Sequence, residues 1–165
     1  GQLGAESGTL SIMAGGDRKA YAACNKIFKS YSKSHKYMGP SGSGQLTKMV
    51  NQICIAGLIQ ALAEGMHFSR RAGLNTTDVM DVISKGAAQS WQMENRWETM
   101  LNDEYDFGFA VDLMRKDLDI VLKQAKKMDT ELEVTDLVNN FYKEIQKSGG
   151  GRWDTSSLLK RVQQK

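Results

Sequence analysis

The sequence predicts a mainly α protein, in which an all-helical domain around one long buried helix follows a short strand–helix–strand segment of an α/β domain. Three observations lead to this prediction. The stretch 49–63 has no charged residue, the apolar residues after Gly73 recur at helical spacing, and short β-prone runs lie before residue 40. We therefore place residues 1–40, which contain the β-prone runs, in one domain and the helical residues 41–165 in another.

Composition is typical of a globular protein rather than of a disordered tail. Of the 165 residues, 41% are hydrophobic and 25% are charged, which is enough apolar material for a core. The net charge is +3, from 22 basic and 19 acidic residues, and it is spread along the chain. A basic run of the kind that binds nucleic acid is lacking, so we expect no nucleic-acid partner.

The cysteines and histidines suggest neither a disulfide framework nor a metal site. Cys24 and Cys54 form no CxxC pair and have no histidine close in sequence, while His35 and His67 are isolated. A reducing cytoplasm is therefore the expected location. The chain starts at Gly1 without an initiator methionine, a basic leader or an apolar stretch. We expect it to be a processed, cleaved or truncated piece of a longer protein.

Residues 8–39 predict one strand–helix–strand unit. A β-prone run, 9–14, ends at Gly15-Gly16, and 36–38 could form a second short strand. Between them Asp17 can cap a helix whose apolar and aromatic residues share one face, namely Ala20, Cys24, Ile27, Phe28 and Tyr31. Two short strands do not make a stable sheet alone, so this unit is expected at the edge of a larger sheet.

A long helix is predicted over residues 43–72, after the glycine-rich turn 39–44. Apolar positions surround 49–63 nearly all the way round, which is typical of a buried helix. This run is too short and too polar to span a membrane, so no membrane partner is expected. Gly57 and Gly65 each cost about 1 kcal/mol relative to alanine in a helix interior, and close packing against another element would explain them.

Helical spacing continues to the end of the chain. Asn75 or Thr76 is expected to cap a helix that stops at Gly86, and further helices are expected around 91–101, 109–127 and 132–146. After the glycine break at 149–151, Asp154 can cap a last short helix. The periodic apolar residues of 109–127 are Leu113, Leu118, Ile120, Val121 and Ala125.

Lys48 is the residue that points most directly to chemistry. It lies one turn into the long helix and is the last charge before fifteen uncharged residues. Burial and the positive end of the helix dipole would both disfavour its charged form, which would let the amine exchange protons near neutral pH. Asn51 and Gln52 follow at i+3 and i+4, on the same helix face. In the alternative, Lys48 reaches the surface and the amides cap neighbouring backbone.

Two further features each allow two interpretations. The glycines of the turn 39–44 could bind an anion at a helix start, or they could simply turn the chain. They do not form the dinucleotide-binding fingerprint, since no third glycine follows at the required spacing. The pair Lys116-Asp117 could be functional, or it could belong to a solvated helix face on which Asp112 pairs with Lys116 at i+4.

Three motifs occur in order along the chain. Residues 8–16 are followed by Gly39-x-x-Gly42-x-Gly44-x-x-x-Lys48-x-x-Asn51 and then by Phe109-x-x-x-Leu113-x-x-Lys116-Asp117-Leu118. Together they resemble the β-hydroxyacid dehydrogenases, which include 3-hydroxyisobutyrate dehydrogenase, tartronate semialdehyde reductase and glyoxylate/succinic semialdehyde reductase and are related to 6-phosphogluconate dehydrogenase. Three ordered motifs are far more specific than any one of them.

The resemblance implies a fold and a reaction. The fold is an all-helical dehydrogenase C-terminal domain preceded by the last strand–helix–strand of a Rossmann-type domain. The reaction interconverts a small β-hydroxy acid and its semialdehyde or keto acid with NAD or NADP, whose nucleotide-binding half would lie outside this chain. The expected partners are that small substrate and further copies of the chain, as a homodimer or homotetramer.

The resemblance also implies roles for individual residues. Lys48 matches the catalytic lysine, which protonates the carbonyl oxygen as hydride arrives and takes the proton back in the oxidative direction. Asn51 and Gln52 would bind the substrate. Lys116 would reach the cofactor, and Phe109 and Asp117 would line that region.

Two departures from the family pattern affect these expectations. Many members have a second asparagine where this chain has Gln52, so substrate contacts are expected to differ here. The family also has a serine–glycine–glycine turn that binds the substrate carboxylate. Gly1 could be the last residue of that turn, which would leave its serine outside the chain. The fragment itself is therefore expected to be inactive.

Two alternatives to this function stay open. A non-catalytic relative could keep the fold as an oligomerisation or binding module, although retention of Lys48 and Asn51 argues against this. An unrelated helical interaction domain would carry the motifs by chance and would have no sheet edge in residues 8–39. The sequence does not choose between NAD and NADP, because the residue that contacts the ribose would lie in the missing half.

Overall fold

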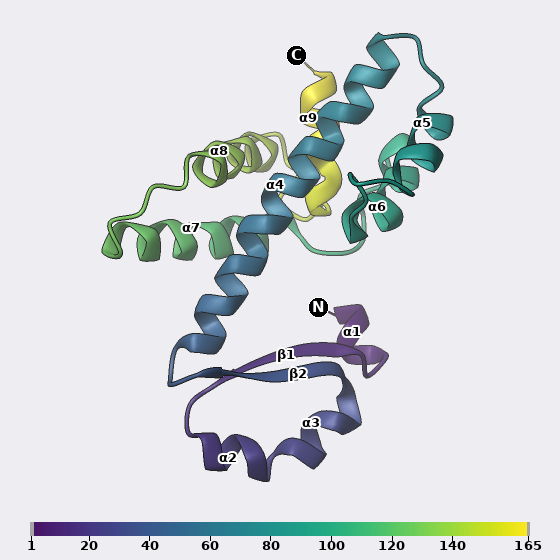
Figure 1. Ribbon diagram of the computed structural model, residues 1–165. Coiled ribbons are helices and arrows are strands. Elements are labelled where there is room, and N and C mark those ends of the chain that lie inside the picture. The colour runs from purple at the N-terminus through teal and green to yellow at the C-terminus, as the bar shows by residue number, and fades with distance from the viewer. Residues whose placement is uncertain (1, 165) are drawn as a thin grey trace. The chain divides into compact units, whose positions relative to one another are not determined.

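The computed structural model describes residues 2–164, which form two compact units that divide between Asn51 and Gln52 (Figure 1). The first unit contains α1 (Gln2–Glu6), β1 (Leu10–Gly15), α2 (Arg18–Ala23), α3 (Asn25–Tyr31), β2 (Ser32–Gly39) and the start of α4 (Ser43–Arg71). The second contains the rest of α4, then α5 (Thr76–Ile83), α6 (Trp91–Leu101), α7 (Val111–Lys127), α8 (Glu133–Lys147), a 3-10 turn (Thr155–Ser157) and α9 (Leu158–Gln163).

The first unit contains the predicted strand–helix–strand order. In its described part β1 and β2 form a two-stranded parallel sheet, joined through α2 and α3. Asp17 caps α2 as predicted, and its side chain accepts a hydrogen bond from the Ala20 backbone N–H at 2.7 Å. The prediction of a single helix after Asp17 is wrong in detail, because the helix is interrupted at Cys24. This residue lies between the end of α2 and the start of α3.

The second strand is longer than predicted and begins at Ser32 rather than at residue 36. The polar residues at the start of this strand do not alternate with apolar ones, so the sequence pattern did not predict a strand there. One of them, His35, pairs with Ile12 in the sheet and shares a 2.8 Å hydrogen bond between its Nδ1 and the Tyr21 hydroxyl of α2. A side chain that is polar but bonded to the covering helix can take a position that alternation alone would assign to an apolar residue.

Glycines bring the end of β1 into backbone contact with the first turn of α4. A Cβ added to Gly15 would lie 2.8 Å from the Gly44 backbone nitrogen, and one added to Gly44 would collide with the Met13 carbonyl oxygen. In the turn itself Gly39 and Gly42 have φ of +133° and +94°, which side chains other than glycine rarely adopt. Gly39 and Gly42 therefore turn the chain, as one of the two interpretations predicted, whereas the close approach at Gly15 and Gly44 is a finding of the structure. Anion binding at this turn stays a prediction.

The second unit is a set of helices around one apolar core, with an isolated bridge between Ala110 and Asp154. The core is filled from α4 through α9 by residues such as Ile59, Met66, Met80, Met114, Leu118, Tyr142 and Leu158. The helices α7 and α8 pack side by side (Figure 1). Arg115 of α7 joins them, because its guanidinium donates to Gln146 Oε1 at 3.2 Å and to the Asn139 carbonyl at 3.1 Å.

The long helix α4 matches its predicted bounds but is not buried all round, so that prediction is wrong for this chain. One face, with Ala56, Ile59, Ala63 and Met66, is fully buried. The opposite face is exposed yet apolar, and carries Val50, Cys54, Leu58, Ala61, Gly65 and Phe68. Among the described residues nothing lies within 4 Å of a Cβ added to Gly57 or Gly65, so the close packing expected at these glycines is absent within the chain.

The same helix is long and apolar enough, by length and composition alone, to cross a membrane. The expectation that the segment is too short and too polar for this is therefore wrong as stated. The criterion is weak evidence, however, because the core helices of soluble proteins also satisfy it. The face of α4 that packs in the helical core favours the role of a core helix, and the absence of a membrane partner stays a prediction.

The buried face of α7 differs from the predicted one at two positions. Val111, Met114, Leu118, Val121 and Ala125 are buried, at spacings of three and four residues. Leu113 and Ile120 were expected in the core but are 42% and 46% exposed. They lie seven residues apart and outside that series, so periodicity among apolar residues alone could not separate the two stripes.

We predict that Gly44→Ala destabilises the chain, because the new methyl group would collide with the Met13 carbonyl at the β1–α4 contact. Overpacking of this kind costs about 1–3 kcal/mol. Urea denaturation measures the change in the free energy of unfolding. Gly57→Ala is the matched control on the same helix, where space is open, and it should gain up to about 1 kcal/mol from helix propensity. Equal effects of the two variants would contradict this account of the contact.

Candidate active site

Three of the predicted site residues come together in the second unit, where α4 packs on α7. The Gln52 amide nitrogen donates a hydrogen bond to Asp117 Oδ2 at 2.9 Å, and it lies 3.8 Å from the Met114 sulfur. The other carboxylate oxygen of Asp117, Oδ1, is 3.2 Å from the Lys116 ammonium. The Lys116 side chain is 62% exposed, whereas Asp117 is 18% exposed and Gln52 is buried. The Lys116–Asp117 ion pair is therefore restrained by a hydrogen bond from the buried Gln52 amide to Asp117.

Lys116 does not form the ion pair with Asp112 that the structural interpretation expected. Its partner is the neighbouring Asp117, while Asp112 Oδ1 accepts a 2.6 Å hydrogen bond from the Gln146 amide of α8. Asp112 therefore belongs to the α7–α8 packing, and Lys116 presents its charge on the outer side of α7.

Lys48 and Asn51 lie in the first unit, on the first turns of α4. Lys48 is exposed and Asn51 is half-buried. The sequence predicts a buried Lys48, which is wrong within this chain, because the side chain is exposed. By helical spacing Lys48 and Asn51 share a face of α4 with Gln52, which follows Lys48 by four residues.

Phe109 is positioned through its backbone by the loop that precedes α9. Its N–H donates to Asp154 Oδ2 at 2.8 Å, and its carbonyl accepts from the Thr155 N–H at 3.0 Å. The next residues are held in the same way, since the Val111 N–H donates to the Trp153 carbonyl at 2.9 Å. The aromatic ring of Phe109 packs at the edge of the helical core. These hydrogen bonds thus fix the start of α7, the helix that carries Lys116 and Asp117.

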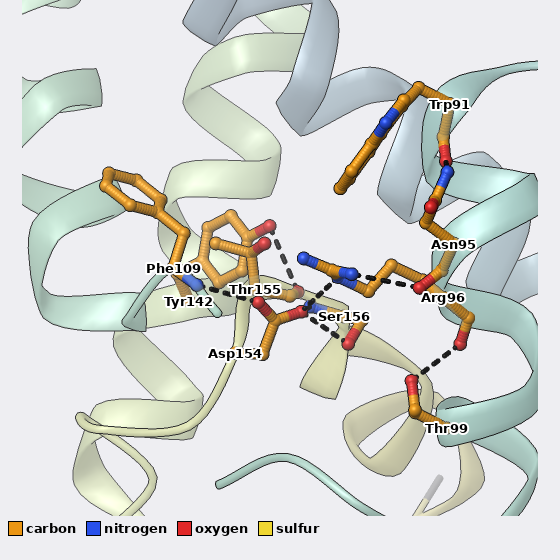
Figure 2. A network of polar contacts seen from close by, with 9 residues as sticks. All are labelled: Trp91, Asn95, Arg96, Thr99, Phe109, Tyr142, Asp154, Thr155 and Ser156. Carbon is orange, nitrogen blue, oxygen red and sulfur yellow. Dashed lines mark hydrogen bonds and ion pairs between the residues drawn. The ribbon is translucent and has the colours of Figure 1, made fainter. Parts of the chain in front are cut away.

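The carboxylate of Asp154 is the centre of this arrangement (Figure 2). It is fully buried, and besides Phe109 it accepts hydrogen bonds from the Ser156 N–H at 3.0 Å and the Ser156 hydroxyl at 2.6 Å. Its charge is balanced by Arg96 of α6, whose Nε lies 3.2 Å from Oδ1. A buried carboxylate is tolerated in a protein core only with a cation and several donors of this kind.

Aromatic rings flank the cation on the outer side of this pair. The Arg96 guanidinium lies 4.9 Å from the centre of the Trp91 ring and 5.1 Å from that of Phe107. Gly108 completes the enclosure, because a Cβ there would collide with the Asp154 carboxylate. Burial raises the pKa of both Tyr105 and Tyr142, so both phenols stay neutral beside this carboxylate.

The sequence predicts Asp154 only as a helix cap, and the structure confirms that cap on the Ser156 N–H. The contacts of Asp154 with Phe109 and Arg96, which lie 45 and 58 positions earlier in the chain, were not predicted. The one signal in the sequence was an Asp-Thr-Ser run beside a glycine-rich break, which indicates a local turn and not distant partners.

Comparison with known proteins identifies the family. A family profile described as the "NAD-binding of NADP-dependent 3-hydroxyisobutyrate dehydrogenase" matches residues 42–162, and one described as the "NAD binding domain of 6-phosphogluconate dehydrogenase" matches residues 1–39. The first of these covers more than half of the chain.

The chain belongs to the β-hydroxyacid dehydrogenase family. An uncharacterized oxidoreductase of Shewanella frigidimarina is 56% identical over 163 residues, which are 99% of this chain and 56% of the relative. The 2-hydroxy-3-oxopropionate reductase of Escherichia coli is 32% identical over 163 residues, with the same two coverages, 99% and 56%. Family membership was predicted from the three ordered motifs and is confirmed.

Solved structures agree with the fold. The 3-hydroxyisobutyrate dehydrogenase of Salmonella typhimurium superposes with a TM-score of 0.86 at 28% identity, over 97% of this chain and 56% of that one. The Mycobacterium tuberculosis 3-hydroxyisobutyrate dehydrogenase gives a TM-score of 0.89 at 22% identity, over 98% and 58%. This chain therefore spans just over half the length of each of these four proteins. A nicotinamide nucleotide, the predicted cofactor, is named in both family descriptions.

We predict that Asp154→Asn destabilises the helical unit by about 3 kcal/mol, because the half-buried Arg96 loses its countercharge and the new amide group would face N–H donors with its own N–H groups. Urea denaturation followed by tryptophan fluorescence measures the loss. Asp103→Asn is the matched control, since Asp103 is 55% exposed where it pairs with Lys160 and exposed pairs contribute about 0–1 kcal/mol. A loss at Asp154 no larger than at Asp103 would show that the buried carboxylate is not a structural centre.

Proposed function

We propose that this chain is the carboxy-terminal catalytic and dimerisation part of an NAD(P)-dependent dehydrogenase that interconverts a small β-hydroxy acid and its semialdehyde or keto acid. The observation that carries the proposal is the three ordered family motifs on this fold, with the Lys116–Asp117 ion pair hydrogen-bonded to the buried Gln52. Relatives named 2-hydroxy-3-oxopropionate reductase and 2-(hydroxymethyl)glutarate dehydrogenase support a small hydroxy acid as the substrate class.

Lys48 is the proposed general acid and base. In the reductive direction its ammonium donates a proton to the substrate carbonyl oxygen as the carbonyl carbon receives a hydride, and the product is the hydroxy acid. In the oxidative direction the neutral amine removes the hydroxyl proton. Its exposure at the start of α4 leaves the amine accessible to a substrate. Asn51, half-buried three residues later, is proposed to hydrogen-bond the substrate beside it.

The residues proposed for the cofactor suit an anionic nucleotide. Bound NAD(P) supplies or accepts the hydride. Lys116 offers a largely exposed ammonium, which attracts phosphate charge. Asp117 restrains that ammonium by its ion pair, and Phe109 adds a half-buried ring at the edge of the same unit.

We expect this chain to lack activity by itself. A parallel sheet is normally covered on both faces and contains several strands, yet the described part of the first unit has two. The remaining strands and the nucleotide-binding fingerprint are proposed to lie in the half that the longer relatives have in addition. A cytoplasmic location stays a prediction.

Association of copies is proposed through α4, as a homodimer or homotetramer. The exposed face of α4 consists of uncharged residues, namely Val50, Cys54, Leu58, Ala61, Gly65 and Phe68. The Phe68 side chain is 71% exposed. Continuous apolar surface of this kind is unusual on a monomer, and small residues at Ala61 and Gly65 let another helix approach closely. A second copy is the occupant that presents an identical face.

We predict that Lys48→Ala in the full-length protein lowers kcat by about 100- to 10,000-fold with its preferred small semialdehyde, the range of general acid–base catalysis. NAD(P)H oxidation against a panel of semialdehydes measures it, with Lys123→Ala as the control for loss of an exposed lysine. Cofactor binding without turnover of any substrate in the wild-type protein would instead support the alternative function, a non-catalytic oligomerisation or binding module.

We predict that Phe68→Ser shifts the full-length protein toward smaller species, because it removes the most exposed large side chain of the α4 face. Sedimentation velocity across a range of concentrations measures the shift. Val82→Ser is the control, since Val82 is 72% exposed but lies on α5. A monomeric wild-type protein, or the same shift in both variants, would contradict association through α4.

A further inference from the structure

The family pattern assigns the position of Gln52 to the substrate, but the structure gives this side chain another partner. Gln52 is 1% exposed, and its amide nitrogen donates to Asp117 Oδ2 at 2.9 Å. The thioether of Met114, itself fully buried, lies 3.8 Å from the same nitrogen. An amide that donates inward to α7 from a buried position directs those N–H groups away from any ligand on the surface.

The hydrogen bond matters because of what Asp117 does with its other oxygen. Neighbouring residues on a helix point about 100° apart and do not normally face each other, so Lys116 and Asp117 pair only if both side chains are held in suitable rotamers. Asp117 Oδ1 lies 3.2 Å from the Lys116 ammonium, while Oδ2 is occupied by Gln52. The buried amide therefore fixes the carboxylate plane, and the carboxylate in turn restrains an otherwise mobile lysine.

We propose that Gln52 is a positioning residue for the cofactor, acting through Asp117 on Lys116, and not a residue that binds substrate through its amide N–H groups. The inference rests on the proposed function, because it takes Lys116 as the group that meets the nucleotide. The side chain of glutamine is long enough for an amide on α4 to reach the carboxylate on α7, and that of asparagine is shorter by one methylene group.

The test uses the full-length protein and two separate readouts. The dissociation constant of NAD(P)H is measured by fluorescence titration without substrate, and the substrate KM is measured at saturating cofactor. Gln52→Met keeps the length of the side chain but cannot donate a hydrogen bond. We expect it to weaken NAD(P)H binding about 5- to 10-fold and to change the substrate KM less than twofold. Gln52→Asn, which is too short, should weaken binding to a similar degree.

A double-mutant cycle separates this role from general damage to the packing. In an Asp117→Asn background, Gln52→Met should change the dissociation constant less than twofold, because the pathway through the carboxylate has already been removed. Lys116→Ala gives the size of the effect expected when the positioned group is lost. Thermal melts of all variants report whether each one is folded, and Gln52→Glu, which repels Asp117, provides a variant of nearly unchanged size.

The outcomes are distinguishable. Additive effects of Gln52→Met and Asp117→Asn, or a raised substrate KM with unchanged NAD(P)H binding, would overturn the inference and leave the proposed function standing. A wild-type protein that binds no NAD(P)H would overturn both. Non-additive loss of cofactor binding with substrate KM retained would support both.

Discussion

The helical unit depends on the burial of one carboxylate, that of Asp154. A single buried charge is costly, and here it is balanced by Arg96 and by three donors, so that α6, the start of α7 and the turn before α9 must all meet at one point. Removing one member would leave another buried and unpaired. Because Phe109 is held by its backbone at this point, the position of α7, and with it that of Lys116 and Asp117, follows from the same interaction.

The second constraint is the length and double apolar character of α4. One face fills the helical core through Ile59 and Met66, and the other is apolar but exposed in this chain. One face of such a helix is already buried in the core of its own unit. Further stability can come only from burial of the other, exposed apolar face. The same continuous helix carries Lys48, and Asn51 and Gln52 follow it three and four residues later. Packing, proposed association and proposed chemistry therefore depend on a single element.

Glycines hold the entry of that helix in place. Gly15 and Gly44 bring two backbones closer than any side chain would permit, so the first turn of α4 is set by the end of β1. The direction in which Lys48 leaves the backbone follows from that contact. The glycines of the turn 39–44 were recognised in the sequence as part of a motif, and their physical roles are a left-handed turn at Gly39 and Gly42 and close approach at Gly44.

The sequence by itself determined the family, the strand–helix–strand order, the bounds of α4 and the caps at Asp17 and Asp154, because these depend on local spacing, hydrogen bonds within a few residues and ordered motifs. It could not determine which apolar stripe of α7 is buried, since Leu113 and Val111 are equally apolar and only the neighbouring helices choose between them. Nor could it show that Gln52 bonds to Asp117 or Asp154 to Phe109 and Arg96. Those partners lie tens of residues apart, and a hydrogen bond between distant residues exists only once tertiary packing has brought the two groups within reach.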